Sequence, residues 1–152
     1  IDYSSEYMID ESLLKRIEEK SLLTLKDKYV LIEMSFISAP SQLYEILFQL
    51  QLNNYTPVLA HPERYRFFFN EFDEYYKLIR HGCKFQLNLL STTGYYGTDI
   101  VKISDRLLKN NLINFVGSDI HSQRHIYHMN NRVIIKSINK LVEAIEANKS
   151  FL

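Results

Sequence analysis

The sequence has no tryptophan and little glycine, proline or cysteine: its 152 residues include Gly 4, Pro 3 and Cys 1. A lone cysteine, Cys83, cannot form a disulfide within the chain, which fits a reducing cytoplasm. Net charge is also absent, since Lys+Arg 18 balances Asp+Glu 18, so we expect no nucleic-acid partner. No apolar run approaches the roughly 20 residues that span a bilayer, so we expect no membrane insertion.

Apolar side chains are plentiful enough for one folded core. Hydrophobic residues make up 46% of the chain, with Tyr 11 and Phe 9. A length of 152 residues suits one domain, so we expect residues 1–152 to form a single unit. The first residue is Ile1 rather than Met, and no signal peptide follows it. We therefore expect that an N-terminal portion is missing.

Short aliphatic or β-branched runs alternate along the chain with segments of helical periodicity. Strands are expected near 3–9, 29–32, 57–60, 85–89 and 113–116. Helices are expected from about residue 10, over 43–53, between an Asn70 cap and Gly82, around 100–107, and over 134–145. The last of these carries Ile134, Ile138, Leu141, Val142 and Ile145 on one face. The alternation predicts an α/β fold with a parallel sheet, either open or curled into part of a barrel.

Ionisable residues gather where the expected strands end. Glu33, His61 and Asp119 each stand at or just after a strand end, His121 follows Asp119 by two residues, and Glu6 lies in the first strand. Parallel α/β folds build their sites at this edge. Carboxylates and imidazoles suit Mn, Fe, Zn or Mg. The alternative for each residue is a helix cap or one structural hydrogen bond.

Two arginines follow the same segments. Arg64 comes three residues after His61, and Arg124 three after His121. Guanidinium groups at such a rim can hold a phosphate. The alternative is a pair of surface ion pairs, with Glu63 as the partner of Arg64 or Arg66.

Other phosphate chemistries lack their motifs. No arginine follows Cys83 closely enough to form the phosphate loop of a thiol phosphatase, and we expect this cysteine to be buried. Glycine-rich dinucleotide and nucleoside-triphosphate loops are absent. Of the remaining histidines, His81 is expected at a helix C-terminus. His125 and His128 are expected in an exposed loop, with the alternative that either one orients a ligand or donates a proton.

Six motifs in order carry a resemblance to a known family. They are Glu6-Tyr7-Met8, the segments 29–36, 58–65 and 85–91, Thr93-Gly94-Tyr95-Tyr96-Gly97, and Gly117-Ser118-Asp119-Ile120-His121. Together they resemble the bacterial capsular-polysaccharide tyrosine phosphatases of the polymerase-and-histidinol-phosphatase superfamily. The resemblance implies a distorted (β/α)7 barrel and a metal centre of up to three ions, usually manganese. It also implies hydrolysis of phosphotyrosine on the tail of a cognate bacterial tyrosine kinase that controls capsule export.

The resemblance also implies roles for individual residues. Metal ligands would be Glu6, Glu33, His61, Asp119 and His121, with Glu33 bridging two ions, while Arg64 and Arg124 would bind the phosphate. The His-x-His strand that opens the family's barrel is absent before Glu6. We therefore expect the C-terminal two-thirds of an incomplete barrel, with weak activity or none.

Two other functions stay open. One is a different phosphoesterase of the same superfamily, acting on histidinol phosphate. The other is a non-catalytic remnant that binds the kinase. An open sheet edge would also allow self-association.

Overall fold

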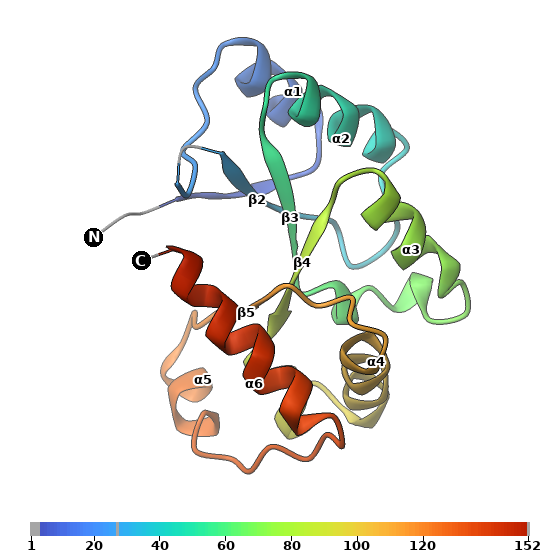
Figure 1. The fold of residues 1–152 in the computed structure, drawn as a ribbon, viewed down its shortest axis with the longest axis vertical. Coiled ribbons are helices and arrows are strands. Elements are labelled where there is room, and N and C mark those ends of the chain that lie inside the picture. Colours follow the sequence, from blue (N-terminus) through green and yellow to red (C-terminus); the bar gives the residue numbers. More distant parts are fainter. Residues whose placement is uncertain (1–3, 27, 152) are drawn as a thin grey trace. The chain divides into compact units, whose positions relative to one another are not determined.

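The computed structural model describes residues 4–26 and 28–151. Strands and helices alternate through them (Figure 1). The strands are β1 (Glu6–Met8), β2 (Tyr29–Glu33), β3 (Thr56–Ala60), β4 (Lys84–Asn88) and β5 (Phe115–Gly117). The α-helices are α1 (Glu11–Glu18), α2 (Leu43–Leu52), α3 (Asp73–Arg80), α4 (Thr98–Lys109), α5 (Gln123–His128) and α6 (Ile138–Ala147). Short 3-10 turns occupy Pro62–Arg64, Arg66–Phe68, Leu89–Thr93 and Asn148–Phe151.

The strands belong to one sheet, in the order β1-β2-β3-β4-β5. The pairs β1–β2, β2–β3 and β4–β5 are parallel. The expected α/β fold with a parallel five-stranded sheet is therefore confirmed. The expected first strand is observed as β1, and residue 3 of that expectation lies outside the described residues.

The chain divides into two compact units. The first contains the described residues up to Ala60, together with Tyr65–Lys84 and Phe151. Within it, α1 and α2 lie side by side (Figure 1). The apolar residues of α2 that recur at helical spacing are all buried: Leu43, Ile46, Leu47 and Leu50.

The second unit contains His61–Arg64 and Phe85–Ser150. Its core includes residues of β4, α4, β5 and α6, among them Leu87, Leu108, Val116 and Leu141. The helix expected around residues 100–107 is observed as α4, and it buries Ile100, Ile103 and Leu107.

Helix α3 begins later than the sequence predicts. Its N-cap is Phe72 rather than Asn70, and no side chain caps it. Phe72 is buried, so packing of this ring outweighs the capping preference of asparagine. The predicted C-terminal glycine is confirmed, since Gly82 follows the C-cap His81 with a φ of +73°.

Helix α6 begins later than the sequence predicts, and only part of its apolar face is buried. Leu141 is buried, but Ile138, Val142 and Ile145 are 41%, 50% and 41% exposed. Ile134 precedes the helix and is also exposed. The helix instead turns Leu141 and the small Ala144, three residues apart, toward the core.

A short helix replaces the loop expected near His125 and His128. Both lie in α5, whose N-cap is Ser122. The Ser122 hydroxyl accepts a hydrogen bond from the His125 backbone N–H at 3.3 Å. The signal was present in the sequence, because serine is a preferred helix N-cap.

The described helices include none with the length and apolar character needed to cross a membrane.

We predict that the side chain of Asp10 stabilises α1. Its Oδ1 accepts hydrogen bonds from the backbone N–H groups of Ser12 at 2.8 Å and Leu13 at 3.2 Å. Asp10→Ala should lower the free energy of unfolding by about 1 kcal/mol. The hydrogen bond from the Ser12 hydroxyl lowers the pKa of Asp10. The difference should therefore be present at neutral pH and shrink as pH falls through the carboxyl range.

Urea unfolding of the chain and of Asp10→Ala at pH 7 and at pH 3 would measure this difference in the free energy of unfolding. The matched control is Glu11→Ala, which alters an exposed residue one position further on. Equal effects of the two substitutions at pH 7 would contradict the prediction.

Candidate metal and phosphate site

Glu6 and Glu33 lie on the same face of the sheet. The β1–β2 register pairs Glu6 with Leu31 and Met8 with Glu33. Side chains two residues apart on a strand share a face, so both carboxylates project to one side. Each residue is half-buried. Adjacent parallel strands therefore supply two carboxylates to one small region.

His61 directly follows β3 and makes a sharp turn. Its φ of +36° lies in the left-handed region, and its backbone N–H donates to the Gln86 carbonyl at 2.8 Å. Burial, followed by the nearby Arg64 cation, lowers the pKa of His61 to about 4. The imidazole is therefore neutral at pH 7, which is the form that binds a metal.

These three residues can hold a cation. Glu6, Glu33 and His61 each offer one ligand atom, and the three atoms lie within 4.8 Å of one another. Carboxylate oxygen and imidazole nitrogen suit Mn, Fe, Zn or Mg. The donor set therefore fits the divalent metal that the sequence predicts.

Asp119 follows β5 and gathers several polar partners. It has a φ of +48°. Its Oδ2 accepts from Arg64 Nη1 at 3.1 Å and from Asn88 Nδ2 at 2.9 Å. Its Oδ1 lies 3.1 Å from His121 Nδ1. The structure thus brings together three predicted site residues: Asp119, His121 and Arg64.

Glu63 is a buried residue that sequence reasoning interpreted as a surface ion-pair partner. Its side chain is fully buried. Its Oε1 accepts from the Ser91 hydroxyl at 2.6 Å and from the Asn88 backbone N–H at 3.1 Å. Burial raises the pKa of Glu63 to about 7. The surface interpretation is wrong because strand β4 and the turn after it cover this carboxyl group.

The two predicted phosphate arginines each lie over a tyrosine ring. The guanidinium carbon of Arg64 is 4.3 Å from the ring centre of Tyr96. That of Arg124, an exposed residue of α5, is 5.7 Å from the ring centre of Tyr95. These tyrosines, like Asn88 and Ser91, were part of the motifs but received no role from the sequence.

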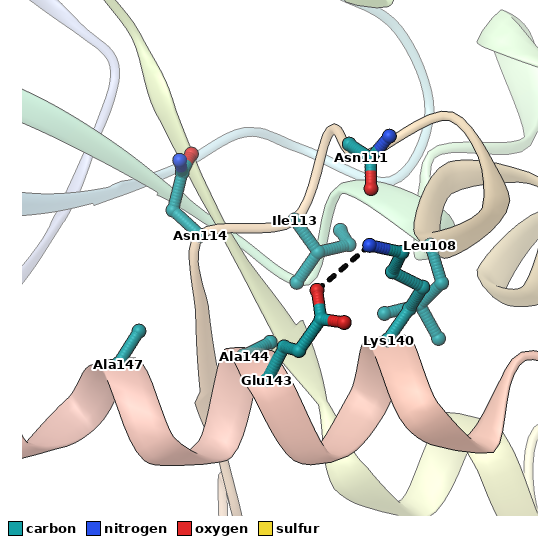
Figure 2. Close-up of a pocket in the computed structure, with 8 residues that line it drawn as sticks. All are labelled: Leu108, Asn111, Ile113, Asn114, Lys140, Glu143, Ala144 and Ala147. Atoms are coloured by element: carbon teal, nitrogen blue, oxygen red, sulfur yellow. Dashed lines mark hydrogen bonds and ion pairs between the residues drawn. The ribbon is translucent and has the colours of Figure 1, made fainter.

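A separate pocket lies elsewhere in the second unit. Figure 2 shows the residues that line it, several of which come from α6. Its volume is about 260 Å³. Its Lys140 is paired with Glu143 at 2.8 Å. None of the predicted site residues lines this pocket.

The sheet and the donor cluster define an α/β protein with a candidate metal site. Comparison with known proteins gives its family. The family described as "Capsular polysaccharide synthesis, CpsB/CapC" matches residues 1–145. The chain belongs to this CpsB/CapC family.

Individual relatives are named as tyrosine phosphatases. The chain is 38% identical to the tyrosine-protein phosphatase YwqE of Bacillus subtilis over 75% of this chain and 44% of that protein. It is 31% identical to the tyrosine-protein phosphatase CpsB of Streptococcus pneumoniae over 80% of this chain and 53% of that protein. The chain therefore spans about half the length of these curated relatives.

A solved structure is similar over most of the chain. It comes from work on YwqE of Bacillus subtilis and CpsB of Streptococcus pneumoniae, described as unique metal-dependent tyrosine phosphatases. The TM-score is 0.73 at 30% sequence identity, covering 97% of this chain and 56% of that one. The resemblance stated from the motifs is thus confirmed.

We predict that Ser91 stabilises the buried Glu63. Ser91→Ala removes the 2.6 Å hydrogen bond to Oε1 and should lower the free energy of unfolding by about 1–3 kcal/mol, because the carboxyl group stays buried. Urea unfolding followed by circular dichroism would measure the change. The exposed Ser118→Ala is the control, and a Ser91→Ala effect no larger than the control's would refute the prediction.

Proposed function

We propose that these residues form part of the active site of a metal-dependent phosphotyrosine-protein phosphatase. Its substrate is the phosphotyrosine tail of a cognate bacterial tyrosine kinase in capsule or exopolysaccharide regulation, in the cytoplasm. The observation that carries the proposal is the cluster of Glu6, Glu33 and His61, whose ligand atoms lie within 4.8 Å of one another. The relatives named as tyrosine phosphatases support the choice of substrate.

The proposal extends to the fold. The strand order runs from β1 to β5 without reversal. Consecutive parallel strands joined by helices are the pattern of a β/α barrel, whereas a doubly wound sheet reverses its order. We therefore assign the five-stranded sheet to an incomplete distorted (β/α)7 barrel.

The metal ligands proposed are Glu6, Glu33, His61, Asp119 and His121. They would hold up to three Mn²⁺ ions. Bound cations would supply a Lewis acid and lower the pKa of water, so that a nucleophile exists near neutral pH. Asp119 and His121 already lie in contact, with 3.1 Å between Oδ1 and Nδ1.

Arg64 and Arg124 would bind the phosphoryl group. Their guanidinium groups present N–H donors in a planar fork that matches phosphate oxygens. In the transition state negative charge is spread over these equatorial oxygens, and fixed cations placed beside them stabilise it. The leaving group is the phenolate of tyrosine, whose conjugate acid has a pKa of about 10. A proton donated by a histidine would assist its departure.

No covalent phosphoenzyme is needed in this proposal. The thiol of Cys83 is buried, and burial raises its pKa to about 12. It is therefore neutral at pH 7 and a poor nucleophile. The hydrolysis is assigned to direct attack by water.

We predict that Glu33→Gln weakens Mn²⁺ binding at least about tenfold, because an amide lacks the carboxylate charge. Electron paramagnetic resonance of free Mn²⁺ during a titration would measure the affinity. Glu11→Gln, on the exposed side of α1, is the matched control. Equal affinity of the chain and Glu33→Gln would refute the proposed metal role.

Substrate choice is tested by comparing hydrolysis of a phosphotyrosine peptide and of histidinol phosphate in the presence of Mn²⁺. We predict weak release of phosphate that is faster from the phosphotyrosine peptide than from histidinol phosphate, with Asp119→Ala reducing that rate at least about tenfold. A faster rate on histidinol phosphate would favour the other phosphoesterase activity. Hydrolysis of neither compound, with retained binding to the kinase tail, would favour a non-catalytic kinase-binding role.

A further inference from the structure

Two adjacent tyrosines occupy a tight turn beside the proposed phosphate arginines. Gly94 and Gly97 flank Tyr95 and Tyr96 and have φ values of +86° and +104°. The Gly97 backbone N–H donates to the Gly94 carbonyl at 3.0 Å. A positive φ at both ends of the turn favours glycine. The turn therefore fixes the backbone positions from which the two tyrosine side chains project.

The rings pack against each other and each carries one arginine. Tyr95 and Tyr96 meet edge to face, with ring centres 4.7 Å apart and planes at 83°. Arg64 lies over Tyr96, at 4.3 Å, and Arg124 over Tyr95, at 5.7 Å. Both distances are within the range of a cation–π contact.

Arg64 has two partners at once. Its guanidinium carbon lies over the Tyr96 ring, 4.3 Å from the ring centre, and its Nη1 donates to Asp119 Oδ2 at 3.1 Å. A cation–π contact does not need a hydrogen bond, so the Tyr96 ring can hold the guanidinium while other N–H groups bind a phosphate. The Tyr96 hydroxyl lies 3.4 Å from Asn88 Nδ2, which also donates to Asp119. The ring, the carboxylate and the arginine therefore share one network.

We infer that Tyr96 and Tyr95 are positioning residues that hold Arg64 and Arg124 for the phosphate of the substrate. The inference rests on the proposed phosphatase function. Tyr96 has the stronger role, because its arginine is closer and partly buried, whereas Arg124 is exposed on α5. The alternative is that the rings only pack the turn against its neighbours.

Binding of inorganic phosphate in the presence of Mn²⁺, measured by titration calorimetry, separates these roles. We expect Tyr96→Leu to weaken phosphate binding about five- to tenfold, because leucine fills space without a π face. Tyr96→Phe keeps the ring and should stay within about twofold. Tyr95→Leu should weaken binding about two- to fivefold. The matched control is Tyr127→Leu, at an exposed position of α5, which should leave binding unchanged.

The failures of the inference and of the proposed function are distinguishable. If Arg64→Ala weakens phosphate binding but Tyr96→Leu does not, the inference is wrong and the proposed role of Arg64 stands. Equal losses in Tyr96→Phe and Tyr96→Leu would also overturn the inference. If Arg64→Ala leaves binding unchanged, or the chain binds no phosphate, both the proposed function and the inference fail.

Thermal unfolding of each variant checks that the fold is kept. If Tyr96→Leu is not folded at the assay temperature, Tyr96→Met replaces it with the same expected loss. In steady-state hydrolysis of a phosphotyrosine peptide, Tyr96→Leu should raise KM and lower kcat, with Tyr96→Phe restoring both. A merely structural role would lower the amount of active protein without changing KM.

Discussion

The hydrogen bonds of Asn88 fix the relative positions of three chain segments in the second unit. Its backbone N–H donates to Glu63 Oε1, its Nδ2 donates to Asp119 Oδ2, and its Oδ1 accepts from the Leu90 N–H. Asn88 is buried, and a buried polar group left without a partner costs about 1–3 kcal/mol. Each of these bonds is therefore strongly favoured, and the position of Arg64 depends on them through Asp119. The geometry of the candidate phosphate site thus depends on Asn88, a buried residue that contacts neither metal nor phosphate in the proposed scheme.

Local sequence pattern predicted the sheet and the places where ionisable residues follow it. Continuous apolar runs such as Val30–Ile32 mark strands covered on both faces, and a residue that follows such a run lies at the edge of the sheet. Glu33 and His61 could therefore be placed near one another without any structure, and their cluster with Glu6 agrees with that placement. Assignment of specific metal and phosphate roles depended on the family resemblance and not on these patterns.

Local sequence pattern could not predict long-range contacts or which face of a helix packs against the core. The partners of Glu63 lie 25 and 28 positions further along the chain, and its neighbours in sequence gave no sign of its burial. On α6 the apolar residues cover more of the helix surface than its neighbours bury, so periodicity alone could not select the inner face. Leu141 packs inward with the small Ala144, while Val142 stays half exposed. The shape of the neighbouring core determines which residues of α6 are buried. Local sequence does not reveal that shape.

Cys83 has a consequence for redox control. A phosphatase that uses a thiolate can be switched off when peroxide converts its nucleophile to a sulfenic acid. Oxidation of this kind requires thiolate character and access to solvent, whereas Cys83 is buried next to β4 and has a pKa of about 12. Cys83 is the one cysteine of the chain. In the folded state, residues 1–152 therefore expose no reactive thiol that hydrogen peroxide could oxidise as a signal.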